Sequence, residues 1–295
     1  MTEPPAGRRA AIRLPSHFAA RARAVLDGIV APVTPRDAAT VMLLRPPPDG
    51  TAETGRAAGP GLQVYMLRRR SSMAFAAGAY VFPGGSVDAS DDTSIAWTGP
   101  DAAEWGRLLG APAELARTLV CAAVRETFEE CGVLLAGPDA GTVLAAAEDE
   151  GWEEDRRQLQ AGSLSLAQLL HRRGLVLRSD LLRPWARWIT PVTEERRYDT
   201  RFFAAALPAG QIARDVSGEA DETAWLEPGA ALEAAGRREI ALFPPTAVTL
   251  GELRACRTVP AALAARRRMT ALIPEVMVAE GAAWLTVPDE VEYPL

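Results

Sequence analysis

The sequence contains no lysine, so all 32 of its basic residues are arginine. Arginine is therefore the only side chain with a permanent positive charge, and any phosphate bound through charge must be bound by it. The 38 acidic residues leave a net charge of −6, and the pI is about 5.2. This balance argues against a general nucleic-acid binder or a protein held at an anionic membrane, because both need a basic face.

Cysteine and histidine are also scarce, with three cysteines (Cys121, Cys131 and Cys256) and two histidines. The cysteines are too few and too scattered for a disulfide framework, and none has the spacing of a zinc site. The first residues, MTEPPAGRRAAIRLP, lack an apolar core of signal-peptide length, and no apolar run approaches the roughly 20 residues that span a bilayer. We therefore expect a cytoplasmic protein without a membrane or nucleic-acid partner.

The hydrophobic content, 48% of 295 residues, is enough to fill a sizeable core. Residues 1–14 read as a flexible lead, and residues 16–26 as a short helix capped by Ser16. Two apolar runs, AATVMLLR and LQVYMLRR, are typical of neighbouring strands joined by a long Pro/Gly loop. The mixture of strand and helix patterns predicts a single α/β domain with helical insertions.

Further along the chain, helical spacing is clearest over residues 112–131, where a proline opens the segment and Gly132 follows it. Residues 142–173 predict two more helices broken near Gly162. ARWITPV, TRFFAAALP and ETAWL predict strands, and PPTAVTLGELRAC predicts a helix opened by proline. The ending PEVMVAEGAAWLTVP, with Gly281 at its centre, predicts a hairpin.

The chemistry is concentrated in RETFEECGV, residues 125–133. On a helix, Glu126, Glu129 and Glu130 share one face, where their carboxylates repel one another unless an arginine or a hard divalent cation lies between them. Glutamate-rich faces are usually solvated surface. Here the preceding turns are apolar, and the acids lie at the carboxyl end of the helix, where its dipole disfavours anions. Both features favour a compensating ligand.

A second motif, VFPGGSVDASDD, lies upstream at residues 81–92. Together the two motifs place a glycine, Gly85, six positions before an acid, and then an Arg-Glu-x-x-Glu-Glu-x-Gly run beginning at Arg125. This arrangement resembles the Nudix box of the Nudix hydrolases. It departs from the box in having Asp91 where glutamate is usual, and in the long segment 92–124 between its halves. FPGG, the interrupted box, ARWITP and FPPT are similar to the branch of that family that contains the peroxisomal coenzyme A diphosphatase.

The resemblance implies a Nudix-type α/β/α sandwich with a mixed sheet and helical insertions. It covers the chain from about residue 36 to the end. We therefore expect an N-terminal extension over residues 1–35 and a Nudix hydrolase domain over residues 36–295, with insertions at about 92–111 and 140–175. The first insertion would cover the site or extend an interface, and the sequence leaves both alternatives open.

The resemblance also implies a catalytic site that uses Mg²⁺ or Mn²⁺. The expected metal ligands are Glu126 and Glu130 first, then Glu129, as ligand or as the base that orients water, with the backbone carbonyl of Gly85. Arg125 would position a carboxylate. Asp91 would replace the usual glutamate, unless that role passes to Asp88 or Asp92. Glu219 and Glu222 are candidates for a further acid, and the alternative is that both are solvated loop acids.

The expected activity is pyrophosphohydrolysis of a nucleoside diphosphate linked to another moiety, with coenzyme A or acyl-CoA as the first candidate. ADP-ribose or NADH is the alternative substrate, and a non-catalytic nucleotide-binding regulator is the alternative function. Arg70 and Phe82 are the expected substrate-binding residues, and Arg68 and Arg69 are further candidates for phosphate contacts. Trp188 and Trp225 would stack a base or lie in the core. The expected partner is a small-molecule nucleotide, and a homodimer is left open.

Overall fold

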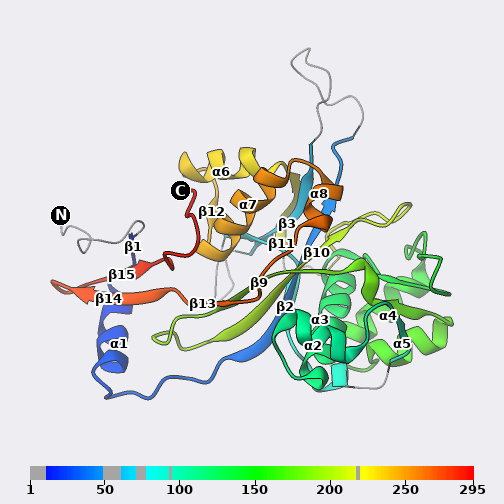
Figure 1. Ribbon diagram of the computed structural model, residues 1–295, viewed down its shortest axis with the longest axis horizontal. Coiled ribbons are helices and arrows are strands. Elements are labelled where there is room, and N and C mark those ends of the chain that lie inside the picture. The colour runs from blue at the N-terminus through cyan, green and yellow to red at the C-terminus, as the bar shows by residue number, and fades with distance from the viewer. Residues whose placement is uncertain (1–10, 49–60, 71–77, 93–94, 217–219) are drawn as a thin grey trace, which may run out of the picture.

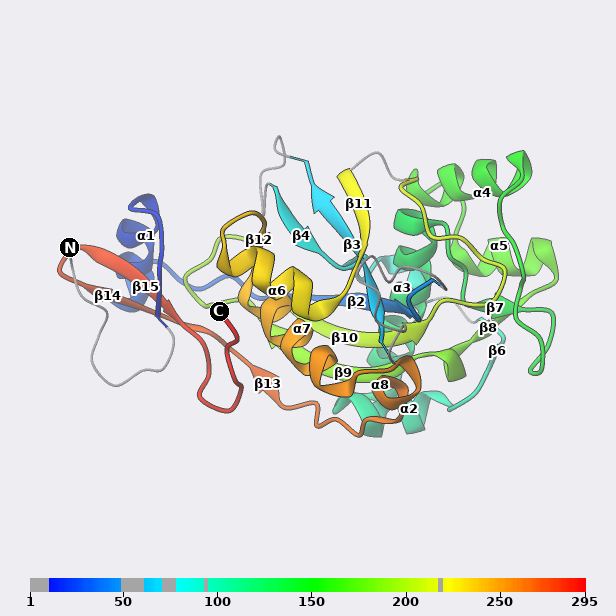
Figure 2. The same ribbon diagram turned by 90° about the horizontal axis from the view of Figure 1, so that it is seen from above.

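The structure is a computed structural model that describes residues 11–48, 61–70, 78–92, 95–216 and 220–295. A twisted, mixed sheet lies between two layers of helices (Figures 1 and 2). This is the α/β/α arrangement that the resemblance to the Nudix hydrolases implied. The predicted loop between the first two strands falls mostly in residues 49–60, outside the described part of the chain.

The central sheet has the spatial order β12-β4-β3-β2-β10-β9-β13, with β5 paired to β2 and β11 paired to β3. Its strands are β2 (Arg36–Arg45), β3 (Gln63–Arg69), β4 (Ala79–Val81), β5 (Gly84–Ser86), β9 (Arg183–Ile189), β10 (Tyr198–Ala206), β11 (Ala220–Leu226), β12 (Ala241–Leu242) and β13 (Ala271–Leu272). Strands β2 and β10 run parallel over nine residue pairs, from Tyr198 opposite Arg36 to Ala206 opposite Leu44. This pairing joins two parts of the chain that are far apart in sequence.

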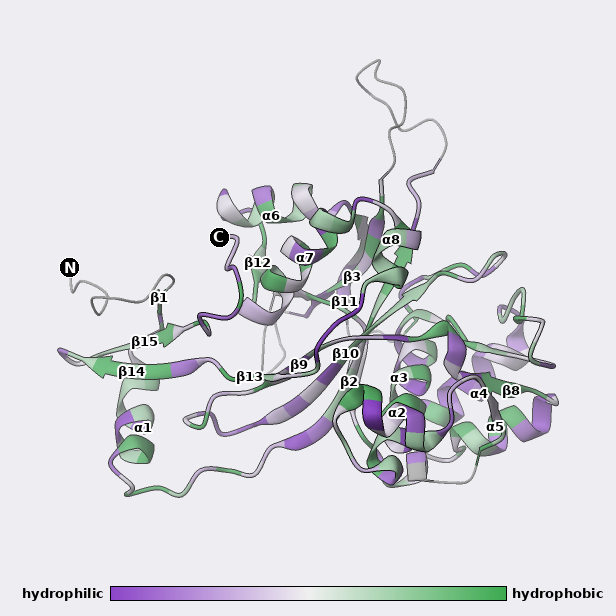
Figure 3. Cartoon of the chain, viewed as in Figure 1, coloured by the Kyte–Doolittle hydropathy of each residue, from purple (hydrophilic) through white to green (hydrophobic). Residues whose placement is uncertain are grey.

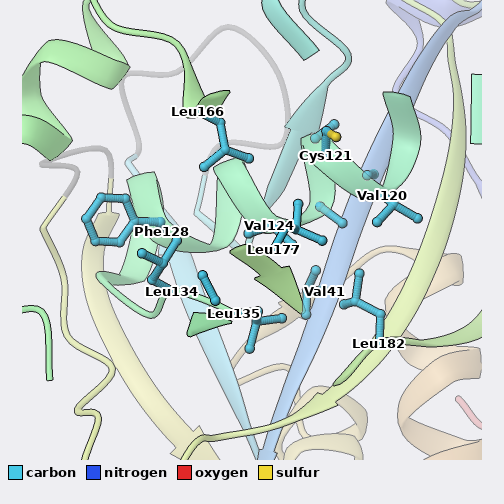
Figure 4. Close-up of a cluster of buried hydrophobic side chains, with 14 of the residues drawn as sticks. Val41, Val120, Cys121, Val124, Phe128, Leu134, Leu135, Leu166, Leu177 and Leu182 are labelled. Atoms are coloured by element: carbon cyan, nitrogen blue, oxygen red, sulfur yellow. The ribbon is translucent and has the colours of Figure 1, made fainter. Parts of the chain in front are cut away.

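Because side chains alternate along a strand, the sheet divides the core in two. On β2, Val41 and Leu43 face one core, and Met42 and Leu44 face the other. The first core packs against α3 (Ala113–Cys131) and α2 (Ala102–Leu109), and Figure 4 shows Val41 in this cluster with side chains of α3. The second core packs against three helices. These are α6 (Pro228–Gly236), α7 (Pro244–Cys256) and α8 (Val259–Ala264).

Helix α3 begins and ends where the sequence predicted. Pro112 is its N-cap, and Gly132 takes a left-handed conformation (φ 70°) at its carboxyl end, where it donates to the Phe128 carbonyl. The helix is buried along most of its length. Helix α2, in the first insertion, packs against α3 and buries Trp105 and Leu109 in the first core. One face of α2 is therefore part of the core.

The second insertion contains α4 (Glu150–Gln160) and α5 (Leu166–Arg173), which confirms the two helices predicted around Gly162. A capping box between Ser165 and Gln168 opens α5. A small sheet lies beside these helices. Its strands are β6 (Trp97–Thr98), β7 (Ala136–Gly137) and β8 (Val176–Arg178), in the order β6-β8-β7.

Segments near the two ends of the chain, residues 11–26 and 275–286, form a small unit at one end of the molecule, the terminal unit (Figures 1 and 3). It contains β1 (Ala11–Arg13), α1 (His17–Leu26) and the predicted hairpin of β14 (Glu275–Ala279) and β15 (Ala282–Thr286). Two sequence predictions were wrong here. Residues 11–13 form a strand paired to β15 and are not part of a flexible lead. Ser16 has helical backbone angles, and its side chain makes no capping hydrogen bond.

Candidate active site

The carboxyl end of α3 packs against β5 and a short 3-10 turn at Ala89–Asp92. Strand β5 is the Gly-Gly-Ser part of the upstream motif, and it pairs with β2. Strand β4 ends at Val81, and Phe82 and Pro83 make the bend into β5. The sheet thus brings the two sequence motifs together, and Arg125, Glu126, Glu129 and Asp91 interact directly.

Arg125 is the hub of this cluster. Its Nε and Nη2 donate to the two oxygens of Asp91, both at 2.9 Å, and its Nη1 donates to Glu126 at 2.8 Å and to Glu129 at 3.3 Å. Nη2 also donates to the Ser86 carbonyl at 3.0 Å. Burial alone would lower the pKa of Arg125, but its acidic partners raise it above the usual value. The guanidinium therefore stays charged and holds the two halves of the motif together.

Asp91 is the acidic side chain of the upstream motif that pairs with Arg125. It is fully buried, and it also accepts the backbone N–H of Asp88 at 2.8 Å. Asp88 is exposed, and the N–H of Ser90 donates to its carboxylate, which lowers its pKa. The side chain of Asp92 lies outside the part that the structure describes.

The glutamates of α3 carry more negative charge than Arg125 offsets. Burial raises the pKa of Glu126 to about 7; the attraction of Arg125 opposes this shift, and the nearby Glu129 adds to it. Burial likewise raises the pKa of Glu129. Asp91, Glu126 and Glu129 share one guanidinium, so this buried group has an excess of negative charge that a bound cation would offset.

The last turn of α3 has a second source of positive charge. Arg156 of α4 is buried and donates to the Glu129 carbonyl at 3.2 Å, and Gln160 donates to the same carbonyl at 3.1 Å. A cation beside free carbonyls at a helix end stabilises that end. The second insertion thus braces the helix turn that carries the glutamates.

The glycine pair allows a close approach between β5 and α3. The Gly84 N–H donates to Glu130 at 2.8 Å. A Cβ placed on Gly85 would overlap Oε1 of Glu126, so any other residue at this position would force that carboxylate to move. Gly85 therefore lets the backbone lie against the Glu126 carboxylate, as expected for a glycine beside a ligand site.

A cavity of about 460 Å³, the carboxylate cavity, lies in front of these groups. Glu126 and Glu130 line it together with two cations, Arg69 and Arg196. The Nε hydrogen of Arg69 is buried and has no acceptor among the described residues. The sequence analysis did not identify Arg196. Arg196 lies two residues before Tyr198, which begins β10 and also lines the cavity. The parallel pairing of β10 with β2 places both residues there, and a sequence pattern does not reveal that pairing.

Of the other residues expected at the site, one lines the carboxylate cavity, two are exposed, and one is outside the described residues. Phe82 is buried beside Phe202 and lines the carboxylate cavity. Arg70 is exposed, 3.7 Å from Asp221, and is not among the residues that line this cavity, whereas its neighbour Arg69 is. Glu222 is exposed on β11 and pairs with Arg68 at 3.7 Å. Glu219 lies outside the described residues.

The donor set suits a hard divalent cation, because Mg²⁺ and Mn²⁺ prefer carboxylate and carbonyl oxygens. Within the described ranges, however, no three acidic, histidine or cysteine side chains converge on one point. Glu126 and Glu129 are bonded to Arg125 and Glu130 to Gly84. The chemistry and the excess negative charge therefore fit a metal, and ligation by all three glutamates would require their carboxylates to come closer together.

Residues 100–253, more than half of the chain, match the family model described as the NUDT19 Nudix domain. The chain is 31% identical to the acyl-coenzyme A diphosphatase NUDT19 of Gallus gallus, over 71% of this chain and 65% of that protein. It is 31% identical to the human protein of that name over 68% and 60%. The alignments thus span less than two thirds of the length of these relatives.

A crystal structure of a Nudix hydrolase from Alicyclobacillus acidocaldarius shares the fold, with a TM-score of 0.63 and 27% identity. The match covers 79% of this chain and 97% of that one. In the part of the chain that the structure describes, no helix is both long and apolar enough to cross a membrane.

Proposed function

Because the chain belongs to the NUDT19 Nudix domain family, we propose that it is a metal-dependent pyrophosphohydrolase of coenzyme A or acyl-CoA. One observation carries the proposal: Glu126 and Glu130 line the same cavity as Arg69 and Arg196. Carboxylates can hold divalent cations, and guanidinium groups can hold phosphate oxygens. A nucleoside diphosphate linked to a second moiety needs both. The similar proteins of Gallus gallus and human are named acyl-coenzyme A diphosphatases.

In this proposal Glu126, Glu130 and Glu129, with the Gly85 carbonyl, hold Mg²⁺ or Mn²⁺. The metal, when bound, makes water more acidic and offsets charge on the diphosphate. Asp91 and Arg125 position the glutamates, since Asp91 holds Arg125 and Arg125 donates to Glu126 and Glu129. Arg69 and Arg196 contact phosphate oxygens, and Phe82 packs against the substrate. Water adds across the phosphoanhydride, one P–O bond breaks, and two phosphomonoesters are released.

The test is a substrate panel with purified protein in Mg²⁺ or Mn²⁺. Coenzyme A, octanoyl-CoA, ADP-ribose, NADH and a diadenosine polyphosphate are each incubated, and the products are separated by chromatography. We expect 3′,5′-ADP from the coenzyme A compounds, and none when EDTA is present. Turnover of ADP-ribose or NADH in preference to these compounds would contradict the substrate assignment.

A pair of variants on α3 tests the site. Glu130→Gln should lower kcat/KM at least about 100-fold, because it removes a ligand of a metal that would contribute several kcal/mol to stabilising the transition state. Glu114→Gln, on the exposed first turn of the same helix, is the matched control and should keep wild-type activity. If no compound is turned over, or if Glu130→Gln matches the wild type, the chain is not this enzyme and a nucleotide-binding regulator is the better description. The cytoplasmic location and the homodimer stay predictions.

A further inference from the structure

A second cavity, about 390 Å³ in volume, adjoins the carboxylate cavity. The two share a wall of six residues: Thr40, Arg69, Val81, Phe82, Tyr198 and Thr200. A ligand at Arg69 therefore has access to both. The volume is within the usual range for a small-molecule site, about 300 to 1,000 Å³.

This second cavity, the apolar chamber, is lined mainly by apolar side chains. The sheet contributes Trp188, Ile189 and Phe202, and the start of α7 contributes Phe243 and Pro244. Away from the shared wall, its lining residues include one acid, Glu194, and no arginine. Phosphate groups thus belong at the shared wall beside Arg69, and the chamber beyond it suits an uncharged group.

The outer wall of the chamber comes from the terminal unit. Leu14 follows β1, Phe18 lies on α1, and Leu285 lies on β15, and all three line the chamber. The terminal unit holds them in place, because β1 pairs with β15 and the Leu14 N–H donates to the Ala283 carbonyl at 2.9 Å. The terminal unit therefore completes a wall next to the candidate active site.

We propose that the apolar chamber binds the acyl arm of a coenzyme A thioester whose diphosphate lies in the carboxylate cavity, and that Phe18 and Leu285 limit the length of that arm. The inference rests on the proposed function and specifies its substrate. An alkyl chain gains up to about fourfold in affinity for each methylene it buries. A purine would gain less, because its ring nitrogens and amino group would lie against carbon.

The first experiment measures binding without turnover. Wild-type protein in EDTA is titrated by calorimetry with coenzyme A, hexanoyl-CoA and dodecanoyl-CoA. We expect dodecanoyl-CoA to bind at least about tenfold more tightly than coenzyme A, because several methylenes leave water. Leu285→Trp, which narrows the chamber, should remove this difference and leave the affinity for coenzyme A within about twofold. Equal affinities for all three compounds in the wild type would overturn the proposal.

The second experiment controls for folding and separates this inference from the proposed function. Phe18→Ala, which widens the chamber, should raise the preference for the longest chain over hexanoyl-CoA at least about threefold. Leu26→Ala, at an exposed position on the same helix, should change nothing. A chain-length preference unaltered in both chamber variants would place the acyl arm elsewhere. If the wild-type protein turns over no coenzyme A compound in Mg²⁺, the proposed function is wrong. The inference about the chamber is still tested, because the binding titrations do not depend on catalysis.

Discussion

At the scale of single residues, the site depends on an acid that lies outside its cavity. Asp91 is one methylene shorter than the glutamate of the family pattern, and it is fully buried against Arg125 with two hydrogen bonds of 2.9 Å. The 3-10 turn at Ala89–Asp92 brings the backbone close enough for this shorter side chain to reach. Asp91 thus acts by holding Arg125, which in turn holds Glu126 and Glu129.

Asp91→Asn should destabilise the fold and lower activity together. The amide keeps the shape but removes the charge that offsets the buried guanidinium, and breaking a buried ion pair costs roughly 3 kcal/mol. Urea unfolding measures the free energy, with Asp88→Asn as the control, because Asp88 is exposed and its carboxylate accepts hydrogen bonds from its neighbour Ser90. Equal stability of the two variants would show that the Asp91–Arg125 pair contributes little.

The ion pairs of Asp199 should make the free energy of unfolding depend on pH. Burial raises its pKa, but Arg187 and Arg201 outweigh burial, so the folded pKa lies below the usual value. A lowered folded pKa adds stability that is fully present above about pH 4 and is lost as the pH falls through the folded pKa. Asp199→Asn should therefore cost about 2 kcal/mol at pH 7, and the difference from wild type should shrink below about pH 4. Urea unfolding across pH measures it; a constant difference down to pH 2 would contradict the assignment.

At the scale of elements, alanine substitutions at two closely packed glycines should have different effects, one on activity and the other on stability. A Cβ at Gly85 would meet the end of the Glu126 side chain, which can move, so Gly85→Ala should lower kcat/KM at least about tenfold with little change in unfolding free energy. A Cβ at Gly137 would meet the Thr142 carbonyl of the backbone, which cannot easily move. Gly137→Ala should therefore cost about 2 kcal/mol and spare activity. Urea unfolding and initial rates on both variants check this, and a reversed pattern would refute it.

The elements also show how far a sequence pattern predicts structure. Helix α3 was predictable because Pro112, Gly132 and the apolar spacing are local signals. The hairpin around Gly281 was predictable for the same reason, since Gly281 takes a positive φ of 78°. The pairings of β1 with β15 and of β10 with β2 were not predictable. The residues of Ala11–Arg13 and Tyr198–Ala206 carry no local signal that identifies a partner strand far along the chain. Arg196 and the apolar chamber depend on those pairings.

At the scale of the whole molecule, the two cores bury many more hydrophobic side chains than the terminal unit does. Strand β2 lies between both cores, and Val41, Met42, Leu43 and Leu44 have no exposed surface. The terminal unit has a core of three buried residues, Ala22, Val276 and Ala283, with partly buried neighbours. Hydrophobic stabilisation scales with buried area, so the terminal unit has much less of its own. It lies at one end of the long axis (Figure 2).

This difference predicts that the terminal unit opens before the central sheet unfolds. Segments with few buried contacts exchange their amide hydrogens through local openings, whereas core strands exchange only on global unfolding. In hydrogen exchange followed by mass spectrometry, peptides covering β1 and β14 should exchange at least about tenfold faster than peptides covering β2 and β10. Low urea should accelerate β2 and β10 but leave the terminal unit nearly unchanged, because local openings expose little surface. If all four strands exchange at one rate with one urea dependence, the terminal unit and the central sheet unfold together, and the wall it gives the apolar chamber is as stable as the core.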